Sequence, residues 1–192
     1  MKFSIGVPLN YGVVYEKFWW SFVNLQSDKI WGVTRTSSAY LWDMRNNLVK
    51  QFLELPGDVT HLIMIDADME FPSNLIDTFE EAIMAAPKYS IIGIPYMSRE
   101  GDKWHIYEYT DNYVWRPCIN VDEGLIERDA VGTGLICIPR VVFHKMKFPW
   151  FEAYFRNSTI SEDLVFCKKA RELEFKIVST PPLEGVSHLC VS

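Results

Sequence analysis

Residues 60–72 have the sequence THLIMIDADMEFP, and this stretch decides the fold class. The run at 62–65 (LIMI) is apolar at successive positions, which is typical of a strand that is buried on both faces of a sheet. The run ends at Asp66 and Asp68. Ligands of open α/β sheets bind beyond the carboxyl ends of such strands, so we expect both carboxylates to face a crevice.

Two carboxylates one residue apart suit a divalent cation that bridges a protein and a diphosphate, because hard cations prefer oxygen ligands. The alternative role of Asp66 and Asp68 is structural, as caps of the next helix or as braces of a turn. Other parts of the chain must decide between these roles.

Composition limits the class of protein. The 192 residues suit one domain with a sizeable core, and 48% hydrophobic and 15% aromatic residues indicate an ordered globular chain. A formal charge of −6 excludes an overall basic surface for nucleic acid and leaves room only for a local basic patch.

The cysteines and the first residues indicate a cytoplasmic protein. The N-terminal sequence MKFSIGVPLNYG predicts a strand and a turn instead of a secretory signal, and no apolar segment is long enough to span a bilayer. The cysteines show no CxxC spacing, so we expect them to be reduced. They are Cys118, Cys137, Cys167 and Cys190.

Strand and helix patterns alternate through the first half of the chain. Strands are expected at 3–7, 30–34, 62–65 and 90–94, and helices at 14–25, from 37 or 38 to 52, and from 72 or 73 to 87. This order predicts an α/β fold with a mostly parallel central sheet and helices on both faces.

Two segments of this half carry candidate ligand contacts. Pro8 and Asn10 lie in the loop that follows the first strand, where a nucleotide base can rest. Arg45 lies off the apolar stripe of its helix, so it either reaches a phosphate or base or is simply solvated.

The βα rhythm stops between residues 95 and 128, where aromatic residues alternate with polar ones. The segment is either a binding loop for a carbohydrate or base, or a pair of ordinary hairpins. Its aromatic and basic residues are Tyr96, Trp104, Tyr107, Tyr109, Tyr113 and Trp115, with Arg99, Lys103 and Arg116.

Three further signals follow along the chain. Gly132, Thr133 and Gly134 precede an apolar strand, where glycines let a ligand approach the backbone. Glu162 and Asp163 open a helix, an arrangement that the helix dipole alone also favours. His188 is either a structural histidine or a donor to a metal.

Together, in this order and spacing, these motifs resemble GT-A fold glycosyltransferases of the family 2 type, and the resemblance covers nearly the whole chain. It implies a D-x-D motif in which Asp66 contacts the ribose or sugar side, and in which Asp66, Asp68 and His188 form a site for Mn²⁺ or Mg²⁺. It also implies Asp163 as the catalytic base, with Glu162 as the competing choice.

For the remaining residues, the resemblance places the nucleotide at Pro8 and Asn10 and the sugar beside Gly132, Thr133 and Gly134. A single domain over 1–192 would follow, with 95–128 as an acceptor-side insertion or lid. The chain departs from the family in being short and in lacking an acidic residue directly after the second strand, since Asp28 precedes it.

The resemblance implies a metal-dependent hexosyltransferase that uses a nucleotide-diphosphate sugar, with a UDP-sugar as the first choice, and we expect it to be inverting. The acceptor hydroxyl belongs to a glycan, lipid or protein, or as a second choice to a hydroxymethylated DNA base. Two alternatives stay open: a non-catalytic nucleotide-sugar binding module, and a D-x-D phosphohydrolase. The phosphohydrolase is disfavoured because Glu70 stands where that class has Thr or Val.

Overall fold

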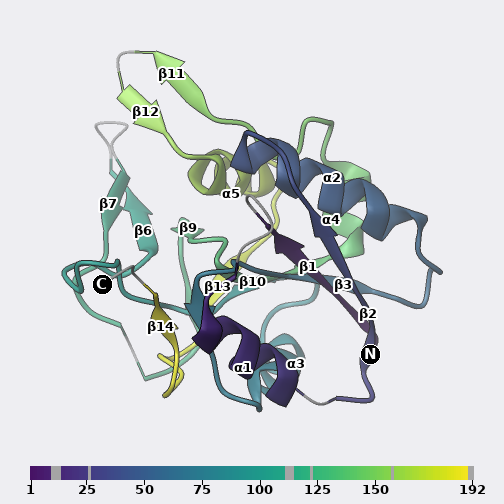
Figure 1. The fold of residues 1–192 in the computed structure, drawn as a ribbon. Helices are drawn as coiled ribbons and strands as arrows, with labels where there is room; N and C mark the ends of the chain where they lie inside the picture. Colours follow the sequence, from purple (N-terminus) through teal and green to yellow (C-terminus); the bar gives the residue numbers. More distant parts are fainter. Residues whose placement is uncertain (10–13, 26, 111–114, 122, 157, 190–192) are drawn as a thin grey trace.

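The computed structural model describes residues 1–9, 14–25, 27–110, 115–121, 123–156 and 158–189, and Asn10 therefore lies outside the described residues. A seven-stranded sheet in the order β2-β1-β3-β10-β5-β13-β8 forms the centre of the molecule (Figure 1). Its strands are β1 (Phe3–Pro8), β2 (Ile30–Thr36), β3 (His61–Ile65), β5 (Ile91–Gly93), β8 (Ile126–Glu127), β10 (Leu135–Pro139) and β13 (Ile177–Ser179).

Most of this sheet is parallel, as the sequence predicts. Strand β1 pairs in parallel with β2 and β3, and β5 pairs in parallel with β13. Strand β10 lies antiparallel between β3 and β5, and β8 is antiparallel to β13. Because β10 runs antiparallel to β3, it begins at the edge of the sheet where β3 ends. The Gly132–Gly134 turn, which precedes β10, therefore lies at that edge.

Helices cover both faces of the sheet. Side chains of α2 (Leu41–Glu54), α4 (Arg140–Lys145) and α5 (Glu162–Glu172) pack on one face, and those of α1 (Glu16–Asn24) and α3 (Leu75–Ala85) pack on the other. Figure 1 shows the first group above the sheet and the second group below it. The predicted α/β class is confirmed.

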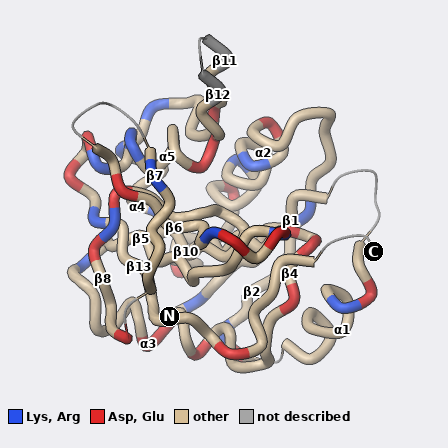
Figure 2. The backbone as a smooth tube through the Cα atoms, turned by 90° about the vertical axis from the view of Figure 1, so that its left-hand side faces the viewer, with Lys and Arg blue, Asp and Glu red and all other residues tan. Residues whose placement is uncertain are grey.

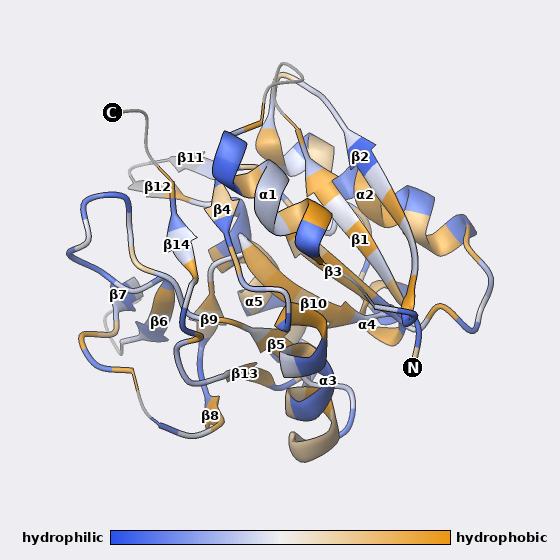
Figure 3. Cartoon of the chain, turned by 60° about the horizontal axis from the view of Figure 1, so that its bottom comes forward, coloured by the Kyte–Doolittle hydropathy of each residue, from blue (hydrophilic) through white to orange (hydrophobic). Residues whose placement is uncertain are grey.

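The successive apolar residues of β3 explain its central place. Leu62 and Met64 contribute to the core under α2 and α5, whereas Ile63 and Ile65 contribute to the core over α1 and α3. All four side chains are fully buried, and Figure 3 shows hydrophobic colouring along β10, its neighbour in the sheet. A strand covered on both faces needs this pattern.

The segment 95–128 contains short strands instead of one irregular loop. Strands β6 (Ile106–Tyr109) and β7 (Trp115–Pro117) form an antiparallel pair, and β6 also pairs with β9 (Ala130–Val131). The ring of Tyr109 lies 4.7 Å from that of Trp115, a cross-strand aromatic pair. The alternative of a hairpin with a cross-strand aromatic pair is therefore correct for β6 and β7.

Two more strand pairs lie outside the central sheet. The hairpin β11 (Tyr154–Arg156) and β12 (Ser158–Ile160) directly precedes α5, and it projects from the body of the molecule in Figure 1. Strand β4 (Met69–Glu70) pairs with β14 (Ser187–His188), so His188 lies opposite Met69. This short pair brings the C-terminal part of the chain beside Asp68.

The guanidinium of Arg140 fixes the end of α2. It donates hydrogen bonds to the backbone carbonyls of Phe52, Leu53, Leu55, Pro56 and Val59, and it lies 4.4 Å from the centre of the Phe52 ring. The last carbonyls of a helix have no partner within the helix, so one planar cation here satisfies several of them.

Among the described residues, no helix is long and apolar enough to cross a membrane.

Candidate active site

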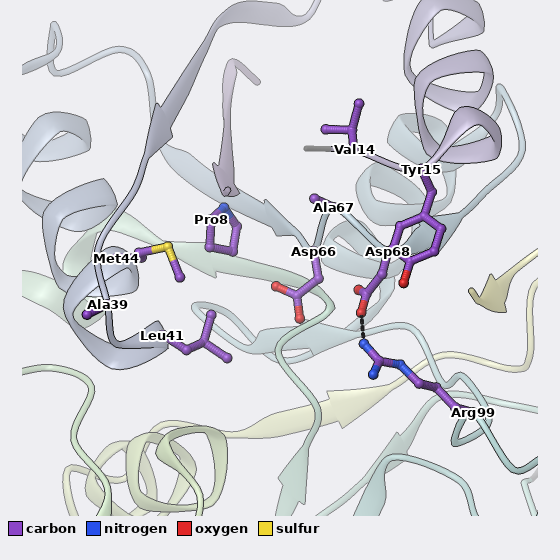
Figure 4. A pocket seen from close by; sticks show the side chains of 10 residues that line it. All are labelled: Pro8, Val14, Tyr15, Ala39, Leu41, Met44, Asp66, Ala67, Asp68 and Arg99. Atoms are coloured by element: carbon purple, nitrogen blue, oxygen red, sulfur yellow. Dashed lines mark hydrogen bonds and ion pairs between the residues drawn. The ribbon is translucent and has the colours of Figure 1, made fainter. Parts of the chain in front are cut away.

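A crevice of about 650 Å³ opens where β1 and β3 end. Figure 4 shows the carboxylates of Asp66 and Asp68 projecting into it, between Leu41 and Met44 on one side and Tyr15 on the other. The lining residues are Pro8, Val14, Tyr15, Ala39, Leu41, Met44, Asp66, Ala67, Asp68 and Arg99. The sequence-based expectation that both acids face a crevice at this edge agrees with this arrangement.

Asp66 directly follows β3, and the backbone fixes its position. Its N–H donates to the carbonyl of Gly134 at 2.9 Å, and its own carbonyl accepts the N–H of Met69 at 3.1 Å. Burial raises the pKa of Asp66 above its ordinary value, although the neighbouring Arg45 acts in the opposite direction.

Arg45 is buried, with 1% of its surface exposed, which excludes the solvated alternative. Its Nη2 lies 3.0 Å from both carboxylate oxygens of Asp66 and hydrogen-bonds Oδ2, and its Nε donates to Glu162 at 3.2 Å. Its Nη1 donates to the carbonyl of Thr133 at 3.4 Å. Burial disfavours the charge, but Asp66 and Glu162 more than offset it, so the pKa of Arg45 lies above its ordinary value.

The sequence analysis placed Arg45 outside the buried face of α2, which is wrong because that face is wider than the apolar stripe. Val49, four residues further along, is also fully buried, and so forms a second buried row with Arg45 beside Met44 and Leu48. Arg45 thus belongs to the side of α2 that meets the sheet. The N–H groups of Arg45 described above all donate to protein acceptors. Its predicted contact with a phosphate or base of a bound nucleotide remains a prediction.

Asp68 lies within one polar group with His188 and Arg99. His188 Nε2 is 3.1 Å from Asp68 Oδ2, and Arg99 Nη2 donates to the same oxygen, as the dashed line in Figure 4 marks. Burial opposes ionisation of Asp68, but the hydrogen bonds from His188 and Arg99 outweigh it and lower its pKa below the ordinary value. Asp68 therefore stays an anion with two cationic or polar partners.

The acid pair at the start of α5 divides into two different environments. Glu162 is 9% exposed and accepts the hydrogen bond from Arg45. Asp163 accepts hydrogen bonds from the Ser161 hydroxyl and from the N–H of Leu164. Burial raises the pKa of Asp163, although these two hydrogen bonds act against the shift. Because Glu162 is held in an ion pair with Arg45, we keep Asp163 as the predicted base of the two.

Tyr96 explains the two glycines of the Gly132–Gly134 turn. Its hydroxyl accepts the N–H of Gly134 at 3.1 Å, and a Cβ at Gly134 or Gly132 would lie 2.7 or 2.5 Å from that oxygen. Close packing by Tyr96 thus requires glycine at both positions. The predicted contact of Gly132, Thr133 and Gly134 with a sugar is a separate matter and stays a prediction.

His105, which the sequence analysis did not name, lies beside the site with Tyr96 and Tyr107, which it named only as aromatic members of 95–128. The His105 ring stacks on Tyr96 at 4.7 Å, its Nδ1 lies 3.0 Å from the Tyr107 hydroxyl, and its ring is 5.8 Å from that of His188. Burial lowers the pKa of His105 and raises that of Tyr107, so both are neutral at pH 7. The aromatic residues of 95–128 were the sequence feature that pointed to this segment. Their spacing did not indicate which side chains pack beside the site.

Asp68 and His188 suit a divalent cation chemically. A carboxylate oxygen and an imidazole nitrogen are donors that Mn²⁺ accepts, and these two already lie side by side. Over the described ranges, no group of three or more His, Cys, Asp or Glu side chains is arranged to hold a metal. A cation held by these two side chains would need further ligands from outside the pair, and it would compete with Arg99 for Asp68 Oδ2.

The overall fold matches known structures. The crystal structure of A197 from STIV superposes with a TM-score of 0.72 at 19% identity, over 100% of this chain and 87% of that one. S. aureus TarS superposes with a TM-score of 0.60 at 12% identity, over 99% of this chain but only 37% of TarS. The fold is that of GT-A glycosyltransferases.

A second structure, TarS 1-349 in complex with UDP-GlcNAc, matches the GT-A fold of this chain with a TM-score of 0.59 at 12% identity. This chain covers 59% of that fragment, so it corresponds to less than two thirds of either TarS chain. No protein-family model and no curated protein sequence matches the chain. The similarity is therefore one of fold, with very low sequence identity.

Proposed function

We propose that this protein is a glycosyltransferase that moves a sugar from a nucleotide-diphosphate sugar to an acceptor hydroxyl. The observation that carries the proposal is that Asp66 and Asp68 line one crevice and that His188, 120 positions from Asp68, contacts Asp68 there. Asp163 lies close enough to Asp66 to interact with it electrostatically. Carboxylates that merely cap a helix would not need an imidazole from a distant strand.

Transfer needs a base for the acceptor. The acceptor oxygen attacks the anomeric carbon, its proton passes to the Asp163 carboxylate, and the bond from that carbon to the phosphate oxygen breaks. The electron pair of the broken bond stays on the departing diphosphate. A buried carboxylate with a raised pKa is a stronger base than an ordinary aspartate, and attack opposite the leaving group inverts the anomeric centre.

The departing diphosphate gains negative charge, which the crevice must stabilise. Asp68 and His188 would hold Mn²⁺ or Mg²⁺, which when bound neutralises phosphate charge as a Lewis acid. Such an ion would compete with Arg99 for Asp68, and Arg99, which lines the same crevice, could then pair with the phosphates. Asp66, held by Arg45, lines the crevice, where it would contact a ribose or sugar hydroxyl.

The crevice also suits a nucleotide. Pro8, Leu41 and Met44 give it an apolar wall at the end of β1 and the start of α2, on which a base can lie. Asp68 and Arg99 occupy the polar end, where a diphosphate belongs. We take a UDP-sugar as the donor because TarS, of the same fold, was determined in complex with UDP-GlcNAc.

The acceptor is a hydroxyl of a glycan, lipid or protein, and a hydroxymethylated DNA base is the second choice. Figure 2 shows acidic and basic residues interspersed along the described backbone, and the net charge is −6. A DNA substrate needs phosphate contacts from clustered cations, so the other acceptors are favoured. We further propose that the chain is one domain, with 95–128 on the acceptor side.

A thermal-shift titration tests the donor. UDP-, GDP-, ADP- and dTDP-sugars are added with and without Mn²⁺ to the wild type and to Asp68→Asn. We expect one nucleotide to raise the melting temperature in a metal-dependent way, and Asp68→Asn to lose that response while it keeps its melting temperature without ligand. No response of the wild type to any nucleotide sugar would overturn the proposal.

A further inference from the structure

A second hollow of about 590 Å³ lies beside the crevice, where α1 packs against β4. In Figure 3, α1, β4 and β14 lie next to one another. The hollow is lined by Lys17, Trp20, Ser21, Asn24, Glu70, Phe71, Pro72 and Ser73. Its volume falls in the range of about 300–1,000 Å³ that is typical of small-ligand sites.

Trp20 gives this hollow a flat apolar wall. Its side chain is 56% exposed, and its Nε1 donates to Glu16 at 3.4 Å, so the indole is tethered at its edge. An indole left in water forgoes hydrophobic free energy that a ligand lying on the ring would recover. The neighbouring Trp19 is equally exposed, at 53%, but does not line the hollow.

Several polar groups line the hollow together with Trp20, and its two charged groups neutralise each other. Glu70 pairs with Lys17 at 3.1 Å and accepts a hydrogen bond from the Ser187 hydroxyl at 2.9 Å. Asn24 and Ser73 are exposed at the rim and offer an amide and a hydroxyl. A charged ligand would have to break the Lys17–Glu70 pair, whereas a neutral ligand rich in hydroxyls can hydrogen-bond to both.

We propose that this hollow binds one unit of a neutral carbohydrate. A sugar ring combines an apolar face of C–H groups, which stacks on an indole, with a polar edge of hydroxyls that donate and accept hydrogen bonds. The wall of Trp20 and the side chains of Lys17, Asn24 and Glu70 match those two surfaces. The assignment does not depend on the proposed transfer reaction.

The hollow is linked to the crevice through β4 and β14. Glu70 lies two residues after Asp68, and its partner Ser187 directly precedes His188. A sugar that contacts Glu70 therefore lies on the strand pair that positions His188.

Nitrogen-15 NMR of the indole N–H groups tests the site, with the methyl β-glycosides of glucose, galactose and N-acetylglucosamine as probes. We expect at least one glycoside to shift the Trp20 resonance in a saturable way. Trp20→Ala should weaken binding of that glycoside at least tenfold, Trp20→Phe should keep part of it, and Trp19→Ala should bind as the wild type does.

Three results would overturn the proposal. One is the absence of a saturable Trp20 shift with any of the glycosides, and another is an equal effect of Trp19→Ala and Trp20→Ala. The third is loss of the nucleotide-sugar thermal shift in Trp20→Ala, since the residue would then support the crevice instead of a separate site. If the wild type responds to no nucleotide sugar but still shows the Trp20 shift, the proposed transfer reaction is wrong and the carbohydrate site stands.

Discussion

Arg45 Nη2 lies 3.0 Å from the carboxylate of Asp66, and Arg45 is buried whereas Asp66 is partly exposed to the crevice. The same guanidinium also holds Glu162, so one buried cation serves one buried and one partly buried anion. Charges of this kind are stable only as a set, because removing one partner leaves the others desolvated and unpaired.

Replacing Arg45 by methionine should therefore destabilise the protein by about 3–5 kcal/mol at pH 7. Without the cation, the pKa of Asp66 in the folded state rises further above its unfolded value. The ionised carboxylate then destabilises the fold, and this penalty is relieved as falling pH protonates it. The loss should accordingly be smaller at pH 5 than at pH 7. Urea unfolding at both values measures this.

The matched control for Arg45→Met is Arg116→Met, because Arg116 is an exposed arginine of β7. It should change stability by less than about 0.5 kcal/mol. Equal effects of the two substitutions would show that the Arg45 ion pairs contribute nothing specific.

Asp163 and Glu162 should respond differently to removal of charge. Asp163→Asn should lower turnover by about 10²–10⁴-fold while the donor still binds, because a general base acts only in the chemical step. Glu162→Gln should mainly reduce stability, because it breaks the buried pair with Arg45. Turnover and donor affinity, measured on both variants, separate these effects, and the reverse pattern would make Glu162 the base.

The rate should also depend on pH through Asp163. A base works only when ionised, so kcat falls as pH drops through its pKa, which burial raises above the ordinary 3.8. We expect the acid limb of the wild-type profile above that value. A limb at or below it would mean that another group accepts the proton.

Arg99 donates to Asp68 Oδ2, the oxygen that would face a divalent cation in the metal site that we propose. Arg99→Ala should therefore strengthen binding of Mn²⁺ alone by roughly tenfold, the equivalent of one charge-assisted hydrogen bond. Because Arg99 lowers the pKa of Asp68, its removal raises that pKa, and the gain should shrink as pH falls. Isothermal titration with Mn²⁺ gives the affinities, with Arg99→Lys as the charge-preserving control, and an unchanged affinity of Arg99→Ala would contradict the competition.

Gly134→Ala should destabilise the protein by about 1–3 kcal/mol, because its Cβ would lie 2.7 Å from the Tyr96 hydroxyl. Gly57→Ala is the control, since a Cβ there meets nothing within 4 Å. Thermal unfolding of the two variants compares them directly. A Gly134 variant as stable as the Gly57 variant would mean that Tyr96 can move aside.

Much of the fold was predictable because local patterns determine it. The unbroken apolar run before Asp66 identified a central strand, and the alternation of helix and strand patterns indicated parallel pairing and helices on both faces. The direction of β10 was not predictable. Its apolar residues look the same whichever way the strand runs, and only its pairing with β3 and β5 sets the direction.

The candidate site was predictable where a residue follows a recognisable strand or opens a helix, as Asp68 and Asp163 do. The partners of these residues were not. Arg99, Tyr96 and His105 lie in a segment without clear periodicity, and their contacts depend on how β6 pairs with β9. The burial of Arg45 was hidden for a similar reason, because its two anions come from distant parts of the chain.

The bond between Arg45 and Glu162 joins residues 117 positions apart. Loops of this length close slowly, so this contact is expected late in folding, after the local pairing of β1 with β2. Until it forms, α5 is not fixed against the helix that carries Arg45. Asp163, the base that we propose, would therefore reach its place only when the tertiary structure is complete, and a partly folded chain would lack it.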